Sequence, residues 1–170
     1  MTELELVLRH LRQPEYVHVL LNPLPVYATA MGVLALAVAL LLRSRPAQVV
    51  GLIVVITGCL SAWPVIYYGH RGYDRVYSMS NHDAQQWLDL HQDRAEDFQY
   101  VFYGTAALAA VTLVGLWKFP RVAIRLAWVT LRATLLSVGA GGWIGHAGGQ
   151  VRHSEFRDGP PPHPVEHQAD

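Results

Sequence analysis

The sequence has few charged residues and long stretches without an acid. Only 15% of its 170 residues are Asp, Glu, Lys or Arg, against roughly 25% in an average soluble domain. No Asp or Glu occurs between Tyr16 and Tyr73, and none between Gln99 and Ser154. Both stretches hold apolar runs long enough to cross a bilayer. A soluble enzyme is therefore excluded.

The sequence also lacks the motifs of several kinds of chemistry. Its one cysteine, Cys59, lies within an apolar run, and there is no CxxCH motif. These absences exclude covalent c-type haem, a cysteine-based zinc site and a disulfide relay within the chain. There is no Ser–His–Asp spacing, phosphate loop or nucleic-acid-binding patch either. We therefore expect an accessory role rather than a stand-alone enzyme.

Four windows contain the roughly 20 mostly apolar residues that a membrane helix needs: residues 24–42, 49–68, 98–117 and 126–145. RSRPAQ joins the first two windows and KFPR joins the last two. Connections this short place successive helices antiparallel. We therefore predict an all-α, up-down four-helix transmembrane domain.

Two further segments flank the four windows. Leu4, Val7, Leu8 and Leu11 recur at helical spacing, which predicts an amphipathic helix over residues 2–13, on the outer surface or against the bundle. The Pro-rich tail, residues 159–170, is expected to be irregular. The transmembrane domain is thus expected to occupy residues 1–158.

The basic residues of the short connections predict the orientation. These connections and the start of the last window hold Arg43, Arg45, Lys118, Arg121 and Arg125 without an acid nearby. By contrast, the connection from His70 to Gln99 is rich in acids. Because Lys and Arg favour the cytoplasmic side, both termini and the acidic connection are expected outside. The net charge of +0 then divides into about +6 inside and about −6 outside.

All nine histidines fall on the outer side of this topology. At 1.5 Å per residue, His70 and His146 are expected near the membrane surface, with His18, His91 and His153 about 10 Å further out. His91 is in helical register with Trp87 and Phe102, so it is expected to face inward.

The last window continues into a face of glycines and histidines: Gly139, Gly142, His146, Gly149 and His153. A second stripe, Gly141, Gly145 and Gly149, forms a doubled GxxxG. Such stripes commonly let two membrane helices approach closely. They also suit a slot in which a flat macrocycle meets the backbone.

Three interpretations of the histidines remain open from the residues alone. One is b-type haem between two imidazoles, with Arg152 near its propionates. Another is a zinc, copper or iron site formed by His18, His91 and His153, with His70 as a further candidate ligand. The third is a non-catalytic subunit of a larger membrane complex, in which the histidines bind carboxylates and the glycine stripes form docking surfaces.

Four segments carry a resemblance to a known group: YVHVLLNPLP (16–25), YYGHRGYDRV (67–76), LHQDRAE (90–96) and GHAGGQVRHSE (145–155). They resemble an uncharacterised family of bacterial four-helix membrane proteins, a domain of unknown function. The resemblance covers residues 14–156 and implies a bacterial inner membrane location. Relatives fused to cytochrome c modules imply redox work near the outer surface. The matching positions are His18, His91, His146 and His153.

We therefore expect a membrane protein that binds b-type haem on its periplasmic side. Its electrons would be exchanged with quinol, with a periplasmic cytochrome or within a larger complex. The expected cofactor-binding residues are His18, His91, His146, His153, Arg152, Gly142 and Gly149.

Overall fold

The computed structural model describes residues 2–162, and these residues are almost entirely helical. Two short helices, α1 (Glu3–His10) and α2 (Pro14–Leu21), begin the chain. The main helices are α3 (Pro23–Leu41), α4 (Arg45–Leu60), α5 (Ala62–Ser78), α6 (His82–Lys118) and α7 (Pro120–Arg152), followed by the 3-10 turn η1 (Ser154–Phe156). The described part of the chain contains no strand. The predicted all-α class is confirmed.

Local sequence signals explain where the helices begin. A proline occupies the first turn of α2, α3, α4 and α7, where its missing N–H costs no intrahelical hydrogen bond. The Asn81 side chain caps α6 by accepting from the backbone N–H of Ala84 at 2.9 Å. Such a cap satisfies a donor that the first turn of a helix leaves free.

Four helical segments are long and apolar enough to cross a membrane: Pro14–Leu41, Arg45–Ser78, His82–Lys118 and Pro120–Arg152. Each contains one of the predicted windows, although the second window includes the break between α4 and α5 at Ser61. The acidic connection from His70 to Gln99 is mostly helix, since only residues 79–81 separate α5 from α6. Its charged residues therefore extend the two long helices beyond the apolar windows.

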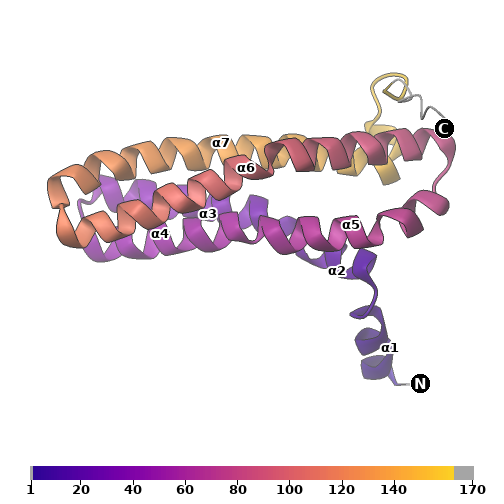
Figure 1. Ribbon diagram of the computed structural model, residues 1–170, viewed down its shortest axis with the longest axis horizontal. Coiled ribbons are helices and arrows are strands. Elements are labelled where there is room, and N and C mark those ends of the chain that lie inside the picture. Colours follow the sequence, from indigo (N-terminus) through magenta and orange to yellow (C-terminus); the bar gives the residue numbers. More distant parts are fainter. Residues whose placement is uncertain (1, 163–170) are drawn as a thin grey trace, which may run out of the picture.

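The long helices pack side by side in antiparallel pairs (Figure 1). α6 packs along α7 and α3 along α4, while α4 also contacts α6 and α3 contacts α7. Their shared core includes Leu36, Leu52, Val55 and Phe102. The α3–α4 and α6–α7 connections lie at one end of the fold, and α2, α5 and the last turns of α7 lie at the other (Figure 1).

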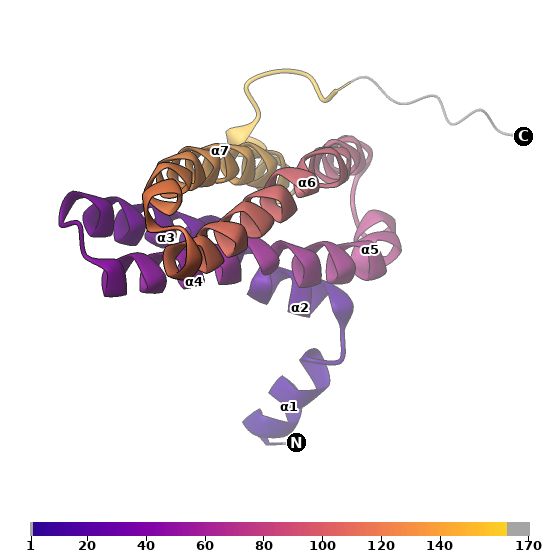
Figure 2. The same cartoon turned by 60° about the vertical axis from the view of Figure 1, so that its left-hand side comes forward.

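The two ends of the chain depart from this packing. α1 buries no residue and projects away from the long helices (Figures 1 and 2). The helix predicted over residues 2–13 is therefore present, and its place on a membrane surface stays a prediction. Residues 159–162 are irregular, as expected. Residues 163–170, the remainder of the predicted tail, lie outside the described residues.

Two glycines of α4 allow α3 to approach closely. A Cβ atom at Gly58 would lie 2.9 Å from backbone atoms of Ala28 and Thr29, and one at Gly51 would lie 3.0 Å from the backbone of Leu36. Small residues have this role where membrane helices contact each other backbone to backbone. A side chain at Gly58 would therefore force the two helices apart.

Replacing Gly58 with valine is expected to lower the stability of the detergent-solubilised protein by about 1–3 kcal/mol, the usual cost of overpacking. Thermal unfolding followed by circular dichroism measures the effect. Gly104→Val is the matched control, because a Cβ at Gly104 meets nothing within 4 Å. Equal unfolding temperatures for the two variants would contradict the proposed close contact.

Candidate functional site

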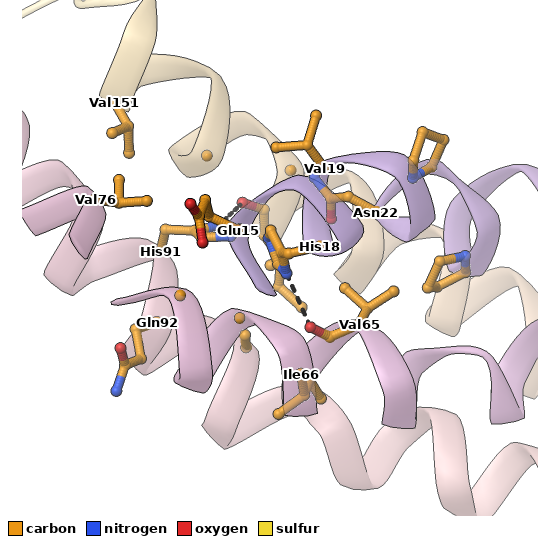
Figure 3. A pocket seen from close by; sticks show the side chains of 18 of the residues that line it. Glu15, His18, Val19, Asn22, Val65, Ile66, Val76, His91, Gln92 and Val151 are labelled. Carbon is orange, nitrogen blue, oxygen red and sulfur yellow. Dashed lines mark hydrogen bonds between the residues drawn. The ribbon is translucent and has the colours of Figure 1, made fainter. Parts of the chain in front are cut away.

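A cavity of about 840 Å³ lies at the end of the fold opposite the two short connections (Figure 3). Residues of α2, α5, α6 and α7 line it, together with the start of α3. Its size is within the range of about 300–1,000 Å³ that is typical of ligand and cofactor pockets. The lining includes His18, His70, His91 and His153.

His18 on α2 and His91 on α6 line this cavity and are held in the same way. Nδ1 of His18 lies 2.8 Å from the Val65 carbonyl oxygen, and Nδ1 of His91 lies 2.9 Å from the Ile144 carbonyl oxygen (Figure 3). Because a carbonyl only accepts, each Nδ1 carries the proton and each Nε2 keeps a lone pair. Metal-ligating histidines have this arrangement, with the second nitrogen donating to a carbonyl or carboxylate.

The spacing of the two rings suits a shared metal ion. Their centroids lie 6.2 Å apart and their planes are inclined at 76°. A metal–nitrogen bond of about 2.0 Å, with about 1.1 Å from nitrogen to ring centre, puts the centroids of two opposed imidazoles about 6.3 Å apart. The observed separation therefore matches the distance between two imidazoles that share one metal ion.

Two glycines lie directly against these rings. A Cβ atom at Gly69 would lie 3.0 Å from Nδ1 of His18, and one at Gly148 would lie 3.0 Å from Nδ1 of His91. A larger residue at either position would push the imidazole away from its carbonyl. These two glycines and the two carbonyls were not singled out in the sequence. The only available signal was that both glycines lie in glycine–histidine segments, GHRG and GHAGG.

The α7 side of the cavity is a wall of glycine backbone. Gly142, Gly145 and Gly149 line it, so the predicted Gly142 and Gly149 do border the cavity. A Cβ at Gly142 or Gly145 would meet nothing within 4 Å. Side chains at these positions would therefore enter open space at the cavity. A wall without side chains leaves room for a flat ligand beside the helix.

No family model, curated protein or solved structure matches this chain. The resemblance to bacterial four-helix membrane proteins thus stays a prediction, and the interpretation of the site depends on its own geometry.

The other predicted ligands have different surroundings. His153 lines the cavity, but its Nδ1 lies 2.9 Å from Glu155 Oε1 and its ring stacks on Phe156 at 4.9 Å. The backbone N–H of Glu155 and the His153 ring hold the pKa of that carboxyl below its usual range. Arg152 is an exposed lining residue, whereas His146 is exposed and lies outside the lining.

His18 and His91 lie closer to the predicted lower tier of histidines than expected. His18 lies beside Gly69, the residue before His70, and His91 lies beside Gly148, two residues after His146. The packing of α2 against α5 fixes this register. Glu15 Oε1 is 2.9 Å from Arg75 Nη1, and Gly72 lets the Glu15 backbone approach closely.

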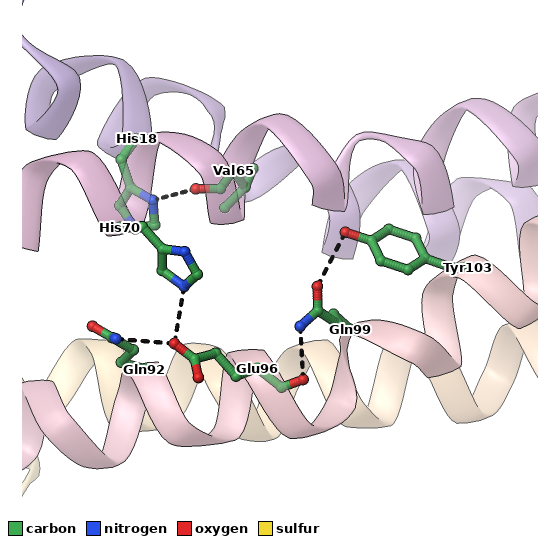
Figure 4. A network of polar contacts seen from close by, with 7 residues as sticks. All are labelled: His18, Val65, His70, Gln92, Glu96, Gln99 and Tyr103. Carbon is green, nitrogen blue, oxygen red and sulfur yellow. Dashed lines mark hydrogen bonds and ion pairs between the residues drawn. The ribbon is translucent and has the colours of Figure 1, made fainter.

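A three-histidine metal site is not assembled in residues 2–162. No group of three or more His, Cys, Asp or Glu side chains in this part of the chain is placed to hold a metal ion. The His18–His91 pair is therefore the candidate ligand set. His70 is instead paired with Glu96, whose Oε1 lies 3.0 Å from its Nε2 (Figure 4).

Proposed function

We propose that this protein is a multi-pass membrane protein that binds b-type haem between His18 and His91 and transfers electrons on its outer side. One observation carries the proposal. Two imidazoles, each oriented by a backbone carbonyl, lie with centroids 6.2 Å apart in a cavity of about 840 Å³. His18 and His91 would hold the haem iron, and the glycines of α7 leave open space beside them.

The membrane and its orientation are supported by the surface of the helices. Large apolar side chains on the outside of the long helices are exposed, among them Leu34, Val38, Val111 and Leu136. The basic connections, which contain Arg43, Arg45 and Lys118, are together at the end away from the cavity. The preference of Lys and Arg for the cytoplasm supports a periplasmic position for the cavity in an up-down bundle.

The chain's own residues have distinct tasks in this proposal. Haem supplies an iron that carries one electron at a time. His18 and His91 would ligate this iron, with their imidazole tautomers fixed by the carbonyls of Val65 and Ile144. Arg152, which lines the cavity, would pair with a propionate. Because no histidine is predicted toward the inner end of the bundle, electrons are exchanged on the outer side only.

The absorption spectrum of the purified protein tests the haem proposal. A Soret band and a pyridine haemochrome of b type are expected at about one haem per chain, as two axial imidazoles imply. Elemental analysis should find iron in the same proportion. Protein that lacks both the Soret band and the haemochrome, although expressed with haem available, would overturn the proposal.

A second candidate function is that of a non-catalytic subunit in a larger membrane complex. The observation that favours it is α1, which buries no residue while Leu4 and Leu8 are 67% and 52% exposed. An apolar face of this kind usually contacts a bilayer surface or a neighbouring protein. Isolation as a stable, monodisperse particle without co-purifying proteins would count against this function.

A further inference from the structure

A polar pair joins α5 to α6 beside the same cavity. His70 Nε2 lies 3.0 Å from Glu96 Oε1, and Gln92 Nε2 donates to that oxygen at 2.9 Å (Figure 4). His70 and Gln92 line the cavity that holds His18 and His91. The side chains of His70 and Glu96 are nevertheless 49% and 43% exposed. The pair can therefore be reached from outside the fold.

The geometry of this pair leaves one ring nitrogen of His70 open to a ligand. An ionised carboxylate only accepts, so the proton of the His70 ring lies on Nε2, toward Glu96 Oε1 at 3.0 Å, and Nδ1 keeps a lone pair. A proton received at Nδ1 would leave this contact with Glu96 in place. A histidine supported by a carboxylate in this way is a common general base.

The position of the pair indicates where its ligand comes from. His70 follows the apolar window 49–68 by two residues, and Glu96 precedes the window 98–117 by two. The pair thus lies where the apolar part of the fold ends. Tyr67 precedes His70 by three residues and Tyr100 follows Glu96 by four, and both are exposed. Tyrosine side chains favour the membrane interface. A molecule dissolved in the bilayer would meet the pair at its polar end.

We propose that the His70–Glu96 pair binds the headgroup of a membrane quinol and accepts its proton. This inference rests on the proposed haem function, which provides the electron acceptor. One O–H bond of the quinol would break: the proton would pass to His70 Nδ1, and the electron would pass to the bound haem, which supplies one-electron chemistry, so that a semiquinone remains. A soluble one-electron carrier would then take up the electron, and His70 would release its proton to water. A second such step yields the quinone.

The test measures quinone binding separately from haem content. Decylubiquinone is titrated calorimetrically into the detergent-solubilised protein. His70→Leu is expected to weaken binding about tenfold, the equivalent of one good hydrogen bond. His82→Leu is the matched control, because His82 is an exposed histidine that bonds only to Gln86 within residues 2–162 and lies outside the cavity lining. This control should bind like the unaltered protein.

His70→Gln separates the acceptance of the proton from headgroup binding. Its amide can still bond to the headgroup, so binding is expected to change by less than about threefold, within the range of a weak hydrogen bond. Without a base at this position, decylubiquinol should reduce the haem about 100-fold more slowly. Dithionite should reduce the haem at the same rate as in the unaltered protein. Unchanged reduction by decylubiquinol would overturn the assignment of His70 as the proton acceptor.

The possible failures are distinguishable. Equal decylubiquinone affinity in His70→Leu and the unaltered protein, with a normal Soret band, would overturn the quinol site and leave the haem proposal standing. Weaker binding in His82→Leu to the same degree would also overturn it. Binding that requires His70 in protein without a Soret band would support the quinone site and overturn the haem proposal.

Discussion

Replacing His91 with alanine is expected to abolish the Soret band of the purified protein. The Ile144 carbonyl orients this imidazole at 2.9 Å and Gly148 gives it room, so no other side chain can take its place without rebuilding the contact. His18→Ala is expected to have the same effect, because the Val65 carbonyl and Gly69 hold that ring in the same way. Haem content per chain, measured as the pyridine haemochrome, gives the result.

Two histidines of α7 and its end provide the matched controls. His146 is exposed and outside the cavity lining, and His153 is bonded to Glu155 and stacked on Phe156. His146→Ala and His153→Ala should therefore keep the spectrum of the unaltered protein. If the Soret band persisted in His91→Ala and were lost in His153→Ala, the iron ligand would be His153 and not His91.

Added imidazole makes the His91 result more specific. The alanine variant leaves a space the size of the lost ring, which free imidazole can enter as a replacement ligand. Millimolar imidazole should restore a six-coordinate spectrum in His91→Ala, and it should change the unaltered protein little. A variant that has simply misfolded would not respond. This outcome distinguishes the loss of a ligand from the loss of the fold.

The part of the fold that could be predicted from the sequence was its four apolar helical segments. Hydropathy located the four windows because a bilayer requires long uninterrupted apolar runs. The windows end near Tyr68 and Phe98, but α5 continues to Ser78 and α6 begins at His82. Hydropathy does not predict whether these turns are helical, because their charged residues are compatible with either helix or loop. The Asn81 cap was the local signal that a helix begins there.

The sequence indicated His18 and His91 as candidate ligands, but it did not indicate that these two histidines lie next to each other. His18 and His91 were candidates because they are imidazoles on one side of the membrane. Their mutual position depends on the register of α2 against α5, which the contact of Glu15 with Gly72 and Arg75 fixes. Counting residues along straight helices put His18 about 10 Å further out than His70, whereas His18 lies beside Gly69. The orienting groups are backbone carbonyls, which every residue has and no sequence pattern marks.

The glycine wall of α7 leads to the second large effect. Gly145→Leu is expected to abolish haem binding while the protein remains folded. A Cβ at this position meets no atom within 4 Å and borders the cavity, so a leucine side chain would occupy space proposed for the macrocycle. Leucine is also a better helix former than glycine by roughly 0.8 kcal/mol. The helix itself should therefore not be weakened.

Gly139→Leu is the matched control for this experiment. Gly139 lies on the same helix and is also free of neighbours within 4 Å, but it does not line the cavity. The two variants share the same change in propensity and apolar surface, so they differ only in what the leucine fills. Haem content should fall in Gly145→Leu and persist in Gly139→Leu, with similar unfolding temperatures. Full haem content in Gly145→Leu would show that the macrocycle does not lie against α7. Equal loss of haem in both variants would show that filling the cavity is not the cause of the loss.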